Sequence, residues 1–164
     1  MSRQEAAARI PKTNAVRIVE NARIPHEVCR HDFEEDTLDA VSAARKLRAP
    51  AETVFKTLVT RAEADELFVF CVPGNCELDP KKAARAAGRK KIELVKVKEL
   101  FPFTGYIRGG CSPIGMKHAY PAYIDETAAL HDWIYVNAGA RGLQIKIRPT
   151  DLVRVMGAAL ADIV

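Results

Sequence analysis

A lysine lies within an apolar, β-rich stretch of the sequence. Lys56 stands in the run VFKTLV. If its side chain faces the interior, desolvation penalises a free ammonium group and makes an anion or a carbonyl oxygen its natural partner. A lysine on an edge strand that prevents aggregation is the alternative interpretation. On spacing alone, Lys56 is either a ligand-binding residue or a protective surface charge.

A second candidate is a glycine-rich run near residue 110. The sequence RGGCSPIG at 108–115 holds three glycines and a proline, which permit tight turns and close approach of the backbone to a ligand. Its N–H groups can bind a phosphate, a carboxylate or an ester oxygen. The run matches neither GxxxxGKS nor GxGxxG, so ATP and dinucleotide binding have no support. A plain turn is equally compatible, and NAGARG at 137–142 is by itself an ordinary hairpin signal.

Side chains typical of covalent or metal catalysis lack catalytic spacing. Cys111 and Ser112 are adjacent, but no GxSxG motif and no papain-like or caspase-like context surrounds them. A thiol-dependent enzyme using Cys111 is the alternative that they leave open. The four histidines show neither HxxxH nor paired-cysteine spacing. We therefore expect no metal site and no cofactor.

Six basic residues gather on and just after a short expected helix. They are Lys81, Lys82, Arg85, Arg89, Lys90 and Lys91. Such a cluster is usually a solvated face, but it can also hold an RNA end through its phosphates without reading the sequence. The net charge of only +4 favours weak or assisted binding.

Length and composition restrict the class of protein. The 164 residues are 48% hydrophobic and 28% charged, as in globular proteins and unlike disordered chains. One domain at 12–164, preceded by an N-terminal leader at 1–11, is the economical division. No apolar stretch reaches the roughly 18 residues of a membrane span, and the N-terminal segment lacks the apolar core of a secretory signal. We expect a cytoplasmic protein with no membrane partner and with four reduced cysteines.

Periodicity and capping signals predict the elements that must position these residues. We expect a frayed helix at 2–12 and helices at 13–21, 38–49, 79–88 and from Thr150 onward. Strands are expected at 26–31, 53–61, 67–73, 92–97, 106–109, 121–125, 133–139 and 143–147, and a turn at 98–105. Because strands dominate without steady βαβ alternation, the sequence predicts a mixed α/β fold: a largely antiparallel, barrel-like sheet flanked by helices.

Three separated segments together resemble the YbaK/EbsC family of aminoacyl-tRNA deacylases, relatives of the editing domain of bacterial prolyl-tRNA synthetases. They are VFKTLV around Lys56, TGYIRGGCSPIGMKHAYPAYID at 104–125 and IYVNAGARGLQIKIRPTDL at 134–152. With the matching helix LDPKKAARAAGRKKIEL, the resemblance covers nearly everything from Lys12 onward. It implies a YbaK-like fold, and free-standing members of this type release cysteine from tRNA that decodes proline.

The resemblance also implies roles for individual residues. Lys56 takes the position of the family's indispensable lysine, which makes it the expected catalytic residue. The substrate-binding positions are Thr57, Gly109, Gly110, Ser112, Pro113, Gly115, Asn137, Gly139 and Gln144. Gln144 stands where YbaK-type members often carry Asp, which bears on substrate choice. In the YbaK-like mechanism the thiol of the substrate attacks its own carbonyl group, so few acid–base residues are needed.

The implied function is trans-editing deacylation of mischarged tRNA, above all Cys-tRNA(Pro) and also Cys-tRNA(Cys). The expected partners are aminoacyl-tRNA, contacted by the basic cluster, and prolyl-tRNA synthetase in a transient complex; DNA is not expected. The alternatives are a deacylase for Ala-tRNA(Pro) or another small amino acid, and a non-catalytic module that binds tRNA or a synthetase.

Overall fold

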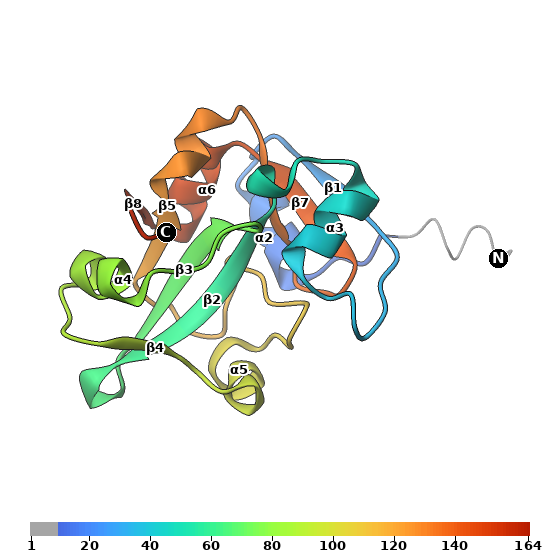
Figure 1. Cartoon of the computed structure of the whole chain (residues 1–164). Helices are drawn as coiled ribbons and strands as arrows, with labels where there is room; N and C mark the ends of the chain where they lie inside the picture. The colour runs from blue at the N-terminus through green and yellow to red at the C-terminus, as the bar shows by residue number, and fades with distance from the viewer. Residues whose placement is uncertain (1–9) are drawn as a thin grey trace, which may run out of the picture.

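A computed structural model describes residues 10–164 (Figure 1). These residues contain five α-helices and eight strands, and the strands form two sheets with the helices around them. The helix expected at 2–12 lies almost entirely outside these residues. Helix α2 (Asn14–Asn21) begins after Thr13, whose side chain accepts a hydrogen bond from the Val16 N–H. The Thr13 hydroxyl also donates to the Ala138 carbonyl at 2.5 Å, which ties α2 to a distant turn.

The smaller sheet is antiparallel and has the order β1-β7-β6. It contains β1 (His26–Arg30), β6 (Ile134–Asn137) and β7 (Leu143–Ile147). Its strands were all expected from the sequence, with ends that differ by one or two residues. Because β1 pairs with β7, the pairing joins the two halves of the chain.

The larger sheet is mixed and has the order β4-β2-β3-β5-β8. Strands β2 (Phe55–Ala62), β3 (Leu67–Pro73) and β4 (Ile92–Leu94) are antiparallel, while β5 (Ala122–Asp125) and β8 (Ala159–Ala161) join in parallel. The predicted mixed α/β class is confirmed. The strands nevertheless form two sheets and not a closed barrel, and the sheets meet at a parallel bridge between Val54 and Tyr135.

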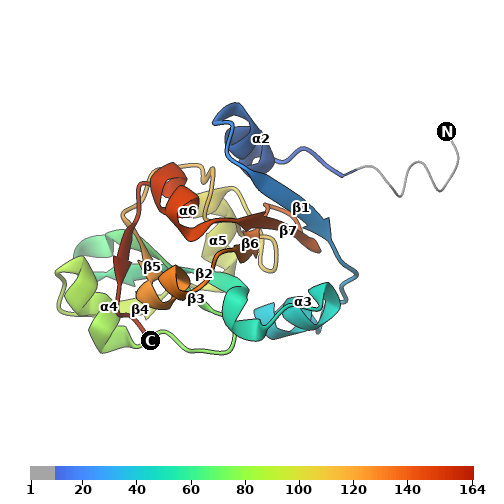
Figure 2. The same ribbon diagram turned by 90° about the horizontal axis from the view of Figure 1, so that it is seen from above.

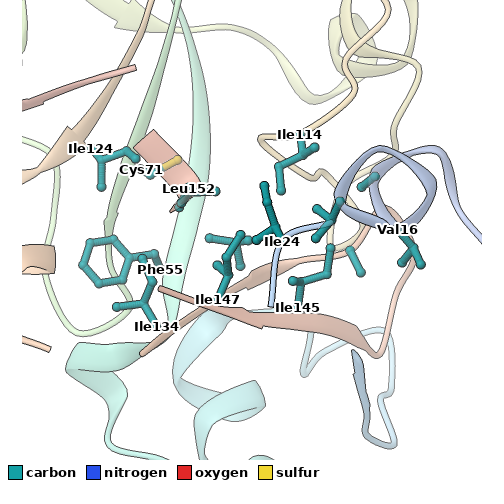
Figure 3. Packing of buried hydrophobic residues seen from close by; sticks show 14 of the residues in the cluster. Val16, Ile24, Phe55, Cys71, Ile114, Ile124, Ile134, Ile145, Ile147 and Leu152 are labelled. Carbon is teal, nitrogen blue, oxygen red and sulfur yellow. The ribbon is translucent and has the colours of Figure 1, made fainter. Parts of the chain in front are cut away.

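The main hydrophobic core lies between the two sheets (Figure 3). Alternation along β7 turns Ile145 and Ile147 inward, where they are fully buried. Phe55 of β2 and Cys71 of β3 meet them from the larger sheet, and Val16 of α2 contributes from the side. Burial of Phe55 anchors the beginning of β2, which fixes the position of the neighbouring Lys56.

Three helices lie where the sequence predicted them, and α4 also follows the expected capping signals. Helix α3 (Ala40–Leu47) begins after Asp39, whose carboxylate accepts from the Ser42 N–H at 2.8 Å. Helix α4 (Pro80–Ala87) begins after Asp79 and ends at Gly88, and α6 is Pro149–Met156. Helices α3 and α4 lie on opposite sides of the β2–β3 pair in both views (Figures 1 and 2).

Three local predictions are wrong. A helix, α5 (Val97–Thr104), replaces the turn expected at 98–105 and the end of the strand expected at 92–97. Helix α5 contains Pro102 and is tied down near its start: Glu99 accepts from the Lys96 N–H at 2.8 Å and pairs with Arg61 at 2.9 Å. Residues 106–109 form a turn instead of a strand, and the short parallel strand β8 has no signal in the sequence.

Candidate active site

A cavity of about 390 Å³ lies where the beginning of β2 approaches the outer face of the smaller sheet. Its walls come from five parts of the chain, within residues 31–43, 54–57, 74–77, 109–111 and 137–144. The volume falls in the range of small-molecule sites, about 300 to 1,000 Å³. Because the parts are far apart in sequence, folding creates this site and no single motif contains it.

Lys56 contributes an ammonium group to the cavity wall. Its side chain is 24% exposed, and its Nζ lies 3.3 Å from Oε1 of Glu77, a side chain that is 93% exposed. Water screens such a pair, so it adds little stability. A negatively charged ligand can therefore displace the Glu77 carboxylate from Lys56.

The two glycine-rich loops are locked to each other by Asn137. Its Nδ2 donates to the carbonyl groups of Gly109 at 3.0 Å and Ala140 at 3.1 Å, and its Oδ1 accepts from the Gly139 N–H at 2.6 Å. Gly109 has a φ of +80°, and a side chain there would meet Leu38 at 3.0 Å. Only glycine lets this loop pass so close to the segment before α3.

The model of one protein family, described as the aminoacyl-tRNA editing domain, matches residues 34–155, which include most of this cavity. The chain belongs to this family. It is 44% identical over 152 residues, 93% of each chain, to the proposed Cys-tRNA(Pro)/Cys-tRNA(Cys) deacylase EbsC of Enterococcus faecalis. The family resemblance stated from the sequence is thus confirmed.

Two further similar proteins have names that refer to the charging of proline tRNA. A proline–tRNA ligase of Shouchella clausii is 34% identical over 92 residues, which are 56% of this chain and 16% of the ligase. The crystal structure of a proposed trans-editing enzyme for prolyl-tRNA synthetase superposes with a TM-score of 0.79 at 26% identity, covering 94% of this chain and 98% of the other.

The structure divides the expected substrate-binding residues of the editing domain into two groups. Those that line the cavity, together with Lys56, are Thr57, Gly109, Asn137 and Gln144. The others, which do not line it, are Gly110, Ser112, Pro113, Gly115 and Gly139.

The second group shapes the loop behind the cavity. The Gly110 N–H donates to the Ile107 carbonyl at 2.9 Å. Ser112 is fully buried, and its Oγ accepts from the Ile114 N–H at 3.2 Å. The Tyr106 hydroxyl donates to the Ile114 carbonyl at 2.7 Å, and its ring fills the space beside Gly139.

Neither thiol near the cavity is activated. Cys111 lines the cavity, and burial raises its pKa to about 11. Cys71 lies deeper, 4.0 Å from the Thr57 hydroxyl, and burial raises its pKa to about 12. Both are therefore protonated near neutral pH, where a thiol is a poor nucleophile. All four cysteines are free, as expected.

Sequence reasoning missed four polar residues that line the cavity: His31, Thr37, Asp39 and Glu77. His31 follows β1, and its Nε2 lies 3.3 Å from Nε2 of Gln144. The signal for this contact was the register of β1 with β7, in which Cys29 faces Gln144. That register depends on two strands at opposite ends of the chain, so no local pattern contains it.

The basic cluster around α4 lies away from α3 and its cavity residues (Figure 2). Lys82 pairs with Asp162 at 3.0 Å, and Arg89 pairs with Glu66 and lies over the Phe68 ring. The other four basic side chains are exposed: Lys81, Arg85, Lys90 and Lys91. Part of the cluster is thus engaged in the fold itself.

Two features are absent from residues 10–164. No group of three or more His, Cys, Asp or Glu side chains there is arranged to hold a metal ion. No helix within the same residues is long and apolar enough to cross a membrane.

Proposed function

We propose that this protein is a free-standing deacylase that cleaves the ester bond of mischarged tRNA, with Cys-tRNA(Pro) and Cys-tRNA(Cys) as substrates. The observation that carries the proposal is the Lys56 ammonium group in a cavity that Gly109 and Gln144 also line. The name of the E. faecalis relative supports the choice of cysteinyl substrates, because the identity extends over nearly the whole of both chains.

Lys56 is the proposed catalytic residue. Its ammonium group binds the 3′-terminal phosphate or polarises the ester carbonyl after the Glu77 carboxylate is displaced. Backbone N–H groups of the loop around Gly109, other than that of Gly110, stabilise the developing oxyanion. This type of interaction contributes most to many acyl transfers. The Gly110 N–H is already bonded to Ile107 and takes no part. Ser112, Pro113, Gly115 and Gly139 hold the shape of the loop.

The attacking group comes from the substrate. An aminoacyl ester is already activated, so positioning matters more than a strong protein nucleophile. The sulfur of the cysteinyl group attacks its own carbonyl carbon. The new C–S bond replaces the ester C–O bond, and the thiol proton goes to the departing ribose oxygen. The cysteinyl group leaves as a cyclic thioester, which water then opens to free cysteine. The protonated state of Cys111 is consistent with a role in packing and not in attack.

The remaining proposals concern the setting of the reaction. Residues 12–164 act as one editing domain in the cytoplasm. The exposed basic residues Lys81, Arg85, Lys90 and Lys91 attract the tRNA backbone through its charge. The related segment in a proline–tRNA ligase supports a transient complex with prolyl-tRNA synthetase, which supplies the choice of tRNA.

Deacylation assays with purified protein test this function. We expect release of cysteine from Cys-tRNA(Pro) and Cys-tRNA(Cys), much slower release from Ser-tRNA(Pro), whose hydroxyl is a weaker nucleophile than a thiol, and none from Ala-tRNA(Pro), which has no side-chain nucleophile. Lys56→Ala should show no activity above background. If none of the four substrates turns over, even with prolyl-tRNA synthetase present, the proposal is wrong. Tight tRNA binding without turnover would instead identify a non-catalytic module.

A further inference from the structure

A second hollow, of about 430 Å³, lies at the C-terminal end of α3. Arg48, Trp133, Tyr135 and Lys146 are among the residues that line it. The candidate active site lies at the other end of the same helix, where Asp39 begins α3. The two hollows are therefore separated by the length of one short helix.

The outer face of the smaller sheet connects the two hollows. In the register of β6 with β7, Asn137 faces Gln144 and Tyr135 faces Lys146. Residues two apart in a strand point to the same side, about 7 Å from each other. The Asn137–Gln144 pair lines the active-site cavity, and the Tyr135–Lys146 pair lines the second hollow. One step along the sheet thus leads from one to the other.

Cations and aromatic rings alternate at the second hollow. The Lys146 Nζ lies 5.9 Å from the ring centroids of both Trp133 and Tyr135, and Cζ of Arg148 lies 5.0 Å from that of Trp133. Leu130 is 80% exposed beside them. Bases stack on such rings, and this stacking strengthens the binding of single-stranded nucleic acid without depending on its sequence.

The cations at this hollow, and Arg148 in the adjoining one, are available to a ligand, although the Asp132 carboxylate also lines the hollow. Within residues 10–164, no carboxylate forms an ion pair with Arg48, Lys146 or Arg148. By contrast, Lys82 and Arg89 beside α4 are held by Asp162 and Glu66. Unpaired cations next to partly exposed aromatic rings favour a polyanion with flat bases over an apolar protein surface.

We propose that the second hollow binds the single-stranded RNA leading to the aminoacyl ester. A base stacks on Trp133 or Tyr135, and Arg48, Lys146 and Arg148 bind the phosphates. The proposal rests on the proposed function, because that function puts the charged end of a tRNA in the neighbouring cavity. The site gives affinity for any RNA sequence, since stacking and phosphate contacts do not read base edges.

The chain contains one tryptophan, so Trp133 itself reports binding. The probe is an uncharged tetranucleotide RNA of sequence ACCA, titrated into the protein while tryptophan fluorescence is recorded. We expect saturable quenching that weakens as salt is raised. Lys146→Ala and Arg148→Ala should each increase the dissociation constant about tenfold, in line with the loss of one charge–phosphate and stacking contact. Arg17→Ala on α2, an exposed arginine with no proposed role in RNA binding, removes the same charge elsewhere and should change nothing.

The activity of the same variants separates this site from the reaction. Arg148 is exposed and forms no cap hydrogen bond for α6 through its side chain, so its truncation leaves the fold intact. On Cys-tRNA(Pro), Arg148→Ala should raise KM with little change in kcat, and on cysteine ethyl ester it should change neither.

Absence of saturable quenching, or equal affinity of wild type, Lys146→Ala and Arg148→Ala for the tetranucleotide, would overturn the proposal. Binding of prolyl-tRNA synthetase, and not of RNA, at the second hollow would also overturn the proposal. RNA binding by a protein that proves inactive on every charged tRNA would support the site and count against the proposed function alone.

Discussion

His31 determines which way the side-chain amide of Gln144 points. The His31 Nδ1 lies 2.8 Å from the Asp32 carbonyl oxygen, which can only accept, so Nδ1 carries the proton of the neutral ring. The other ring nitrogen, Nε2, then accepts, and it lies 3.3 Å from Nε2 of Gln144. The Gln144 amide nitrogen is thus engaged. Under the proposed function, its oxygen is the atom left to accept a hydrogen bond from the α-ammonium group of a bound aminoacyl ester.

Replacing His31 by Phe should release the Gln144 amide while keeping a ring of similar size. We expect KM for Cys-tRNA(Pro) to rise about three- to tenfold, the equivalent of one hydrogen bond, with a smaller change in kcat. Steady-state kinetics measure this, and ¹⁵N NMR of the wild type should find the His31 proton on Nδ1. Kinetics identical to wild type, or a proton on Nε2, would contradict the assigned roles.

The compact ammonium group of Lys56 should be irreplaceable. Lys56→Arg should lose nearly as much activity as Lys56→Ala, at least about a hundredfold in kcat/KM, because a planar guanidinium cannot take the place of an ammonium group at a catalytic position. The measurement is single-turnover deacylation with circular dichroism as a check of folding. A mostly active Lys56→Arg would point to a peripheral phosphate contact.

The partner of Lys56 offers a matched control. Glu77→Gln removes the carboxylate that lies 3.3 Å from the Lys56 Nζ but leaves the ammonium group in place. Since Glu77 is a displaceable partner, we expect activity equal to or above that of the wild type, with a KM that falls at low salt. A loss comparable to that of Lys56→Ala would make Glu77 part of the catalytic machinery.

The Cys111 thiol should not be needed for catalysis. Because burial raises the pKa of Cys111 to about 11, the group is almost entirely the unreactive neutral thiol at pH 7. We expect Cys111→Ser to retain most of the deacylase activity. Alkylation of Cys111 by iodoacetamide, followed by mass spectrometry, should be slow at pH 7 and accelerate steadily toward pH 11. An inactive, folded Cys111→Ser would revive the thiol-dependent mechanism.

Alkaline pH should destabilise the protein because the buried Cys71 and Tyr106 side chains resist losing their protons in the folded state. Burial raises the pKa of Cys71 from 9.0 to about 12 and that of Tyr106 from 10.0 to about 12. The unfolded chain loses these protons first, so their stabilising effect is complete below pH 9 and is lost as pH rises toward 12. Urea midpoints between pH 8 and pH 11 should fall, and less steeply in Cys71→Ala. Parallel pH profiles for both proteins would contradict this account.

Selectivity for tRNA should come from prolyl-tRNA synthetase. The contacts proposed for RNA are charges and stacking rings, which do not distinguish sequences. The isolated protein should therefore deacylate Cys-tRNA(Pro) and Cys-tRNA(Cys) at similar rates, and added synthetase should favour the former. Strong discrimination by the isolated protein at high salt would mean that it has its own sequence-reading surface.

The sequence predicted an element well where the element is bounded by residues that interact with their own neighbours in the chain. Asp79 and Gly88 bound α4 as expected, and the apolar run of β3 was correct at both ends. The failures depend on distant partners. Helix α5 contains Pro102, and the ion pair between its Glu99 and Arg61 of strand β2 fixes it to the larger sheet. Strand β8 exists because β5 offers it an edge.

The candidate site follows the same rule. Lys56 and Gly109 were found because a side chain or a backbone angle in one short motif marks them. His31 and Glu77 could not be found, since each reaches the cavity through strand pairing or a loop that the sequence does not encode locally. Trp133 and Lys146 were treated as ordinary strand residues, because only the register of β6 with β7 puts them together.

The pairing of β1 with β7 also determines when the site can exist during synthesis. His26 faces Ile147 in this pairing, so β1 leaves the ribosome long before its partner strand is made. Until then His31 has no Gln144 to contact and the cavity lacks a wall. The nascent chain is therefore inactive until β7 has emerged, and in that interval β1 is an unpaired strand that can pair with other chains.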